Sequence, residues 1–136
     1  MIKVKSKVKD ALLHMVYRAD EFTEKRTELV DADQFIQCSY LKMDEGQTFK
    51  PHKHIWKSPS VKRVIAQESW VVIRGSVKVF FYDIDGELLE THTLNAGDSS
   101  FTLEGGHTYE ILEDDTLVYE YKTGPYEGQV MDKVFL

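Results

Sequence analysis

The sequence predicts an all-β protein, a double-sheet jelly roll with a short N-terminal extension. From Gln34 onward, short runs rich in β-branched and aromatic residues follow one another, and turns rich in Gly, Asn and Asp separate them. About eight such runs at regular spacing favour a sandwich or barrel over a single flat sheet. The predicted strands are 35–43, 48–54, 67–74, 76–83, 88–94, 99–103, 107–112 and 116–122.

The pair Asp85-Gly86 gives the clearest turn signal. It lies between the apolar runs Phe80-Phe81-Tyr82 and Leu88-Leu89. A tight hairpin turn requires positive φ angles, which Gly and Asp tolerate. The sequence therefore predicts a β-hairpin at this point.

Residues 1–33 are predicted as an extension of a single domain that spans 34–136. Its first part alternates lysines at positions 3, 5, 7 and 9 with small or apolar residues, which indicates the solvated face of an N-terminal strand. Residues 10–28 have a mixed periodicity, and we predict a helix or a loop there. The tail after Gly124-Pro125 ends in apolar residues, which we expect to pack on the body or on a second subunit.

Length and charge limit the class of protein. A chain of 136 residues is the size of one domain, and its net charge of −6 argues against a nucleic-acid partner, because binding to phosphates needs a basic patch. The single cysteine, Cys38, excludes internal disulfides and fits a reducing compartment. No apolar run is long enough for a membrane span, so we expect a cytoplasmic protein. Strand edges invite pairing, so a homodimer is predicted.

His52 and His54 provide the first chemical signal. They lie two residues apart in the predicted strand 48–54, and residues i and i+2 of a strand project from the same face. Both imidazoles could therefore reach one ion, and neutral imidazole suits Zn, Fe, Cu and Ni. Two solvated histidines on an edge strand would give the same pattern.

Two motifs around these histidines resemble those of the cupin superfamily, which consists of small metal-binding β-barrels. In the first, Gly46, five residues and His52-Lys53-His54 match the front half, and Glu68, six residues and Gly75 match the back half. Thirteen residues separate His54 from Glu68, more than the family has there. In the second, a Gly-Asp turn at position 97 leads to Gly105 and His107, while Leu103 replaces the family's Pro and its final Asn is absent.

The resemblance implies that His52, His54, Glu68 and His107 are the ligands of a divalent transition metal, Fe, Mn, Ni or Zn. The ending, residues 119–126 (Tyr-Glu-Tyr-Lys-Thr-Gly-Pro-Tyr) followed by Asp132-Lys133-Val134-Phe135, further resembles the small cupin metalloproteins associated with bacterial surface-polysaccharide (O-antigen) gene clusters. That likeness implies a small polar ligand, such as a sugar or a nucleotide-sugar, without fixing a reaction.

Other roles remain open for residues near this set. An unligated Glu68 would be a general base beside the metal, and Gln67 is the alternative ligand. Arg74 shares strand parity with Glu68 and could hold an anionic group of a substrate, or form a contact at the rim. His14 and His92 are predicted to be surface or structural residues. Residues 55–66 interrupt the strand pattern and are a candidate lid.

Three functions fit these observations. A metal-dependent enzyme would carry out isomerisation, epimerisation or oxygen-dependent cleavage on a small polar substrate. A metal-free isomerase or epimerase would use a histidine, such as His107, as its base. A binding or regulatory module, or a dimeric scaffold, would use the same fold without chemistry.

Overall fold

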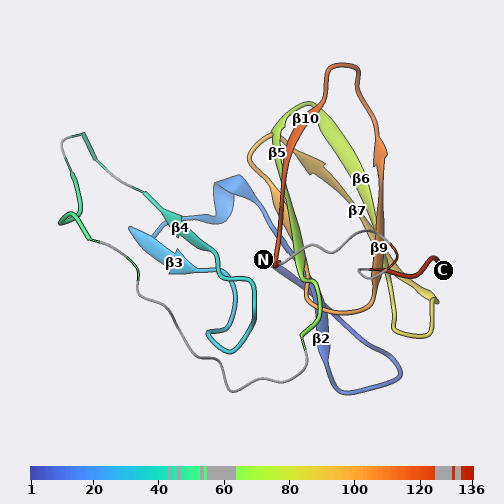
Figure 1. Cartoon of the computed structure of the whole chain (residues 1–136). Helices are drawn as coiled ribbons and strands as arrows, with labels where there is room; N and C mark the ends of the chain where they lie inside the picture. Colours follow the sequence, from blue (N-terminus) through green and yellow to red (C-terminus); the bar gives the residue numbers. More distant parts are fainter. Residues whose placement is uncertain (43, 46, 53, 55–63, 125–129, 131–132) are drawn as a thin grey trace.

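The computed structural model describes residues 1–42, 44–45, 47–52, 54, 64–124, 130 and 133–136. Within this part of the chain, the regular elements are ten strands in three antiparallel sheets and one short 3-10 helix (Figure 1). The all-β prediction is confirmed at this level. The elements are β1 (Ile2–Lys5), β2 (Leu12–Tyr17), η1 (Ala19–Glu21), β3 (Arg26–Glu28), β4 (Ser39–Leu41), β5 (Glu68–Arg74), β6 (Ser76–Tyr82), β7 (Leu88–Asn95), β8 (Ser99–Thr102), β9 (Gly106–Ile111) and β10 (Leu117–Lys122).

Two of the sheets pack face to face over the main core. One has five strands in the order β1-β2-β8-β5-β10, and the other has three in the order β7-β6-β9. Side chains from both sheets form one buried cluster, and we call the sides that carry it the inner faces. This cluster contains Val4, Val16, Val72, Val77, Val79, Phe81 and Leu94.

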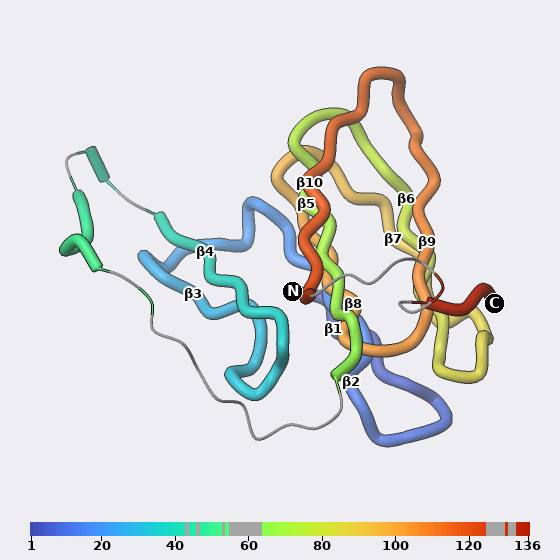
Figure 2. The backbone as a smooth tube through the Cα atoms, in the orientation of Figure 1, coloured from blue at the N-terminus to red at the C-terminus, as the bar shows by residue number. Residues whose placement is uncertain are grey.

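A second core lies on the outer face of the five-stranded sheet. There, residues 22–40, which include the two-stranded sheet of β3 and β4, cover β2 and β8 (Figure 2). Tyr17 donates a hydrogen bond to the carbonyl of Leu29 and so holds this cover in place. Cys38 contacts the same core, and burial raises the pKa of its thiol, which favours the inert protonated form. The buried members of this core are Met15, Tyr17, Leu29, Val30, Ile36, Phe101 and Leu103.

The prediction of a helix or loop over residues 10–28 was wrong for β2. This strand pairs with β1 on one side and β8 on the other, and its residues from Leu13 to Tyr17 are all buried. A strand that is buried on both faces shows no alternation of apolar and polar residues, so its sequence reads like a buried helix. Residues 1–33 thus contribute two strands to the largest sheet.

The predicted strands from residue 67 onward are confirmed as β5 to β10, within a few residues at their ends. The Asp85-Gly86 hairpin is also confirmed, because it joins β6 to β7 and Gly86 has a φ of +89°. The strand predicted over 35–43 was too long, because among its described residues only β4 is a strand. The strand predicted over 48–54 was wrong, since its described residues form none. Most of the candidate lid, residues 55–63, lies outside the described residues.

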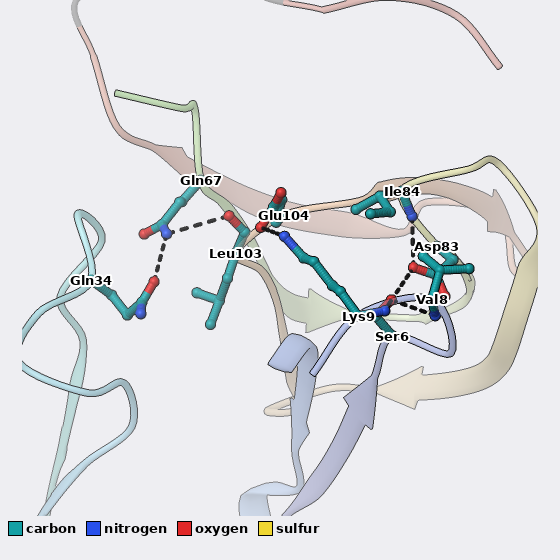
Figure 3. A network of polar contacts seen from close by, with 9 residues as sticks. All are labelled: Ser6, Val8, Lys9, Gln34, Gln67, Asp83, Ile84, Leu103 and Glu104. Carbon is teal, nitrogen blue, oxygen red and sulfur yellow. Dashed lines mark hydrogen bonds and ion pairs between the residues drawn. The ribbon is translucent and has the colours of Figure 1, made fainter. Parts of the chain in front are cut away.

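Polar contacts fix the turns at one end of the two packed sheets. The buried carboxylate of Asp83 accepts a hydrogen bond of 2.6 Å from the Ser6 hydroxyl (Figure 3) and another of 2.6 Å from the Lys7 amide. Nearby, Lys9 forms an ion pair with Glu104 at 2.5 Å. These contacts tie the turn between β1 and β2 to the ends of β6 and β8.

Gly105 occupies a position that only glycine fits, and this gives a stability prediction. Its φ is +81°, and an added Cβ would lie 2.6 Å from the carbonyl oxygen of Tyr82. Gly86 has a similar φ of +89° but open space, since its nearest neighbour would be 3.6 Å away. Both Gly→Ala variants incur the positive-φ cost of about 1–2 kcal/mol. Gly105→Ala should lose about 1–3 kcal/mol more through overpacking. Denaturant unfolding measures this difference, and equal losses would contradict the assigned contact.

Candidate functional site

The register of the five-stranded sheet places two rows of polar side chains on its inner face. Directly paired residues on neighbouring strands share a face, so the pairings of β8 with β2 and β5, and of β10 with β5, define each row. Each row takes one residue from each of β2, β8, β5 and β10. The first row contains His14, Thr102, Glu68 and Lys122, and the second contains Val16, Ser100, Trp70 and Glu120.

These rows meet side chains of β9 on the facing sheet. His107 Nε2 lies 3.0 Å from Glu68 Oε1. The rings of Trp70 and Tyr109 stack with centroids 3.8 Å apart and an angle of 5° between their planes. The Tyr109 hydroxyl forms a hydrogen bond of 2.9 Å with the hydroxyl of Ser100. We call these five residues the inner polar cluster, and they join distant parts of the chain at one place.

Glu68 is held as a carboxylate although it is largely buried. Burial alone raises the pKa of its carboxyl group, but the hydrogen bond from His107 and the charges of His107, Lys133 and Lys122 outweigh this effect, so the pKa lies below its usual value. A carboxylate only accepts hydrogen bonds, so His107 Nε2 carries the proton. In the neutral imidazole, Nδ1 then has the lone pair. The pair remains within reach of small solutes, since the side chains of Glu68 and His107 are 12% and 21% exposed.

Tyr109 supports this pair from the next position on the inner face of β9. Burial raises the pKa of its phenol, which therefore stays protonated at neutral pH. Its ring also contacts that of His107, at a centroid distance of 5.6 Å. Trp70 and Tyr109 thus form an aromatic wall beside a charged and hydrogen-bonding pair. Small polar ligands are held by this combination in many binding sites.

His14 extends the polar row behind Glu68. The imidazole is fully buried and stacks on Phe81 at a centroid distance of 4.4 Å. Nε2 lies 3.0 Å from the Tyr82 carbonyl oxygen and donates to it, so Nδ1 accepts from the Thr102 hydroxyl at 3.2 Å. Desolvation lowers the pKa of His14 to about 4. His14 is therefore a neutral, structural residue at pH 7, as the sequence predicted.

The structure does not bring His52 and His54 to this cluster. Both are exposed, and their rings lie near each other at a centroid distance of 5.4 Å. The segment 47–52 lies on the far side of β3 and β4 from β5 and β9 (Figure 1). It borders an open hollow of about 350 Å³, whose lining includes Leu41 and Phe49. The two predicted pairs of ligands are thus separate.

A metal centre can be compared with this arrangement. Imidazole and carboxylate are suitable donors for the predicted ions. However, the part of the chain that the structure describes contains no group of three or more His, Cys, Asp or Glu side chains that could hold an ion. The described arrangement does not assemble the four-ligand set, which stays a prediction.

Two other predicted site residues have local partners. Arg74 is exposed at the opposite end of β5, about 20 Å from Glu68 at the usual rise per residue. Its Nε donates to the carbonyl of Asp115 at 2.9 Å. Gln67 is buried; its amide nitrogen donates to Gln34 Oε1 at 2.8 Å, and its amide oxygen accepts from the Ile36 amide at 2.9 Å (Figure 3). The Gln67 amide therefore attaches the outer cover to β5.

Sequence reasoning did not identify the roles of Ser100 and Tyr109. Glu68 and Trp70 are two residues apart on β5, and His107 and Tyr109 are two apart on β9, so the alternation of side chains along a strand could have indicated which residues each strand contributes to the cluster. The contact between the two strands depends on how two sheets pack, which no local sequence pattern records.

No family model matches the chain, and searches of curated proteins and solved structures also found no match. Among the described residues, no helix is long and apolar enough to cross a membrane.

The neutral state of buried His14 predicts an acid-dependent loss of stability. Its pKa is about 4 in the folded protein against 6.5 for an unperturbed histidine. Between these values the unfolded chain binds more protons, so the free energy of unfolding falls as the pH decreases from 6.5 to 4, by up to about 3 kcal/mol. Above pH 6.5 this contribution is constant.

Urea unfolding at a series of pH values measures this loss. His14→Phe keeps the stacking on Phe81 but cannot titrate, so its stability should change less over the same pH range. Its absolute stability should be lower, because the Tyr82 carbonyl loses its donor. An unchanged pH dependence in this variant would rule out His14 as the cause.

Proposed function

We propose that the protein binds a small polar ligand at the inner polar cluster and that the Glu68–His107 pair transfers a proton to and from this ligand. The observation that carries the proposal is the 3.0 Å hydrogen bond between a largely buried carboxylate and a partly exposed imidazole. A carboxylate that holds one nitrogen of a histidine fixes the tautomer and strengthens the other nitrogen as a base. This corresponds to a metal-free isomerase or epimerase.

The proton transfer follows from the positions of the donors and acceptors. His107 Nδ1 takes a proton from a carbon adjacent to a carbonyl group, and the positive charge that forms is stabilised by Glu68. The proton on Nδ1 exchanges with solvent, and a proton then returns to the neighbouring carbon in an isomerisation, or to the original carbon in an epimerisation after the planar intermediate has turned its other face to the imidazole. Atoms and electrons balance without a redox partner. The Trp70–Tyr109 wall limits the orientation of the ligand and the access of water.

The proposed ligand class is a sugar or a nucleotide-sugar, and the proposed fold is a cupin-type jelly roll. The cupin-like motifs support both proposals, because the matched residues Glu68 and His107 meet on the inner face of two packed sheets. Stacked aromatic rings beside hydrogen-bonding groups suit a carbohydrate, which presents both apolar C–H faces and hydroxyls. We include assembly as a homodimer in this proposal.

Incorporation of solvent deuterium tests the proton transfer directly. The protein is incubated in deuterated buffer with a panel of free sugars and nucleotide-activated keto sugars, each with a carbonyl next to a C–H, and deuterium at carbon is detected by mass spectrometry. His107→Gln should reduce the exchange rate by about 10²–10⁴-fold, the usual contribution of a general base. Glu68→Gln should reduce it less, because the imidazole remains.

Thr108→Ala provides the matched control, because this exposed neighbour of His107 points away from the cluster. Its exchange rate should be that of the wild type. Saturable binding of a sugar without exchange, lost in His107→Gln, would support the non-catalytic binding module instead. Exchange that persists in His107→Gln would contradict the assigned base.

A divalent metal site is the second candidate, and the geometry of His52 favours it. Its Nδ1 lies 2.9 Å from the carbonyl oxygen of Lys50, so Nδ1 carries the proton and Nε2 presents its lone pair. Metal-binding histidines commonly have this arrangement. In the described part of the chain, the three-stranded sheet ends at β9. Addition of the 48–54 segment to that edge would bring His52 and His54 toward His107.

Elemental analysis of untagged protein tests this candidate without an activity assay. We expect near-stoichiometric Fe, Mn, Ni or Zn in the wild type if the four residues form one site. His107→Ala and the double variant His52→Ala/His54→Ala should then each lose the metal, while His92→Ala should keep it. Loss in the double variant alone would indicate a site at His52 and His54 that does not include the cluster. No metal in the wild type would leave the metal-free function.

A further inference from the structure

The outer face of the five-stranded sheet is only partly covered. Residues 22–40 cover β2 and β8, whereas β5 and β10 carry exposed apolar and aromatic side chains. On β10, Tyr119 and Tyr121 are 53% and 55% exposed, and their rings contact each other at a centroid distance of 6.3 Å. Ile73 of β5 is 42% exposed. We call Ile73, Tyr119 and Tyr121 the β10 stripe.

The backbone of β10 adds a second feature to this stripe. Among the residues that the structure describes, β10 is the last strand of its sheet. The Thr123 amide donates to the Gln67 carbonyl of the β5 side at 3.0 Å. Because backbone groups alternate in direction along an antiparallel pair, the amides and carbonyls of residues 119 and 121 also face β5, and those of Val118 and Glu120 face outward. A strand edge and an aromatic stripe therefore coincide.

We propose that a second copy of this chain binds at this edge and places its own stripe beside this one, through antiparallel pairing of β10 with β10 across a two-fold axis at Tyr119. An edge paired with itself by a two-fold axis satisfies both sets of backbone groups with one surface. Hydrogen bonds would then join Val118 of each copy to Glu120 of the other, and the two five-stranded sheets would become continuous. This inference specifies the homodimer of the proposed function.

Charge disfavours one neighbouring register. With the axis at Tyr119, the two Tyr119 side chains lie opposite each other, and Val118 lies opposite Glu120 of the other copy. A shift that moves the axis to Glu120 brings the two Glu120 carboxylates face to face. Like charges directly opposite each other destabilise a strand pair. The register with its axis at Tyr119 joins aromatic side chains without this repulsion.

The other edge of the same sheet is a poorer candidate. β1 carries Lys3 and Lys5, which are exposed, and lysines on an edge strand oppose pairing with another chain. The stripe on β10 has no charged side chain of its own. The sheet therefore has one protected edge and one edge suited to a second copy.

Sedimentation of purified wild-type protein and of Tyr119→Asp tests the proposal. We expect the wild type to be a dimer and the variant to be a monomer, because the axis would place two carboxylates against each other. Tyr119 is exposed in the single chain, so the variant should fold, and an unchanged melting curve of the dilute monomer confirms this. Thr108→Asp, on the exposed surface of β9, is the control and should stay dimeric.

Disulfide formation then tests the register. In a Cys38→Ser background, Tyr119→Cys should form a covalent dimer on mild oxidation, because directly opposed residues of a non-hydrogen-bonded pair have Cα atoms about 4.5 Å apart. Disulfides span Cα separations of about 4.4–6.8 Å. Tyr121→Cys should not cross-link, since its two copies would lie roughly 14 Å apart along the strands.

A monomeric wild type would overturn the inference, as would a dimer that withstands Tyr119→Asp and gives no Tyr119→Cys cross-link. Deuterium exchange in the Tyr119→Asp monomer separates this result from a failure of the proposed function. If the monomer catalyses exchange, the ligand site is independent of assembly, and the dimer experiments then bear on the interface alone.

Discussion

The position of β8 between β2 and β5 is the constraint on which the rest of the structure depends. Each of its four residues is buried, and each is paired on both sides. Ser100 and Thr102 face inward, while Ser99 and Phe101 face outward. A shift of one residue would exchange these faces, and the hydroxyl groups would enter the outer core in place of Phe101. The register of one short strand thus fixes both the polar rows and the second core.

The inner polar cluster is stable because nearly every buried polar group has a partner. Ser100 bonds to Tyr109, Thr102 to His14, and Glu68 to His107. An unpaired hydroxyl or carboxylate at these depths would cost several times what a paired one contributes. The cluster is therefore cooperative, because removal of one side chain leaves its buried partner without a hydrogen bond. This explains how a polar site can exist beside a core of valines and Phe81.

The strands from residue 67 onward could be predicted because β-branched and aromatic residues fill most of them and a turn sequence lies at each end; this holds even for β8, which is buried on both faces. β2 could not, since burial on both faces removes the alternation of apolar and polar residues, and no Gly, Pro or Asn marks its ends. Glu68 and His107 could be selected from the motifs, and the structure brings them together. His52 and His54 satisfy the i, i+2 rule only within a strand, and a strand needs a hydrogen-bonded neighbour that local sequence does not specify. The role of His14 depends on its pairing with Thr102, 88 residues away, which has no local signal.

The electrostatics of the Glu68–His107 pair limit what a ligand can present to it. Glu68 is ionised at neutral pH, because His107, Lys133 and Lys122 offset the cost of its burial. Nε2 of His107 therefore carries a proton whether the ring is neutral or charged. Nδ1 is the one position whose state changes, from an acceptor in the neutral ring to a donor in the charged one. A ligand that offers an acidic C–H meets the Nδ1 lone pair as a base, and the protonated Nδ1 is then the acid that returns a proton. One imidazole can thus remove a proton from the ligand and, after exchange with solvent, return one, provided that Glu68 keeps its charge through both steps.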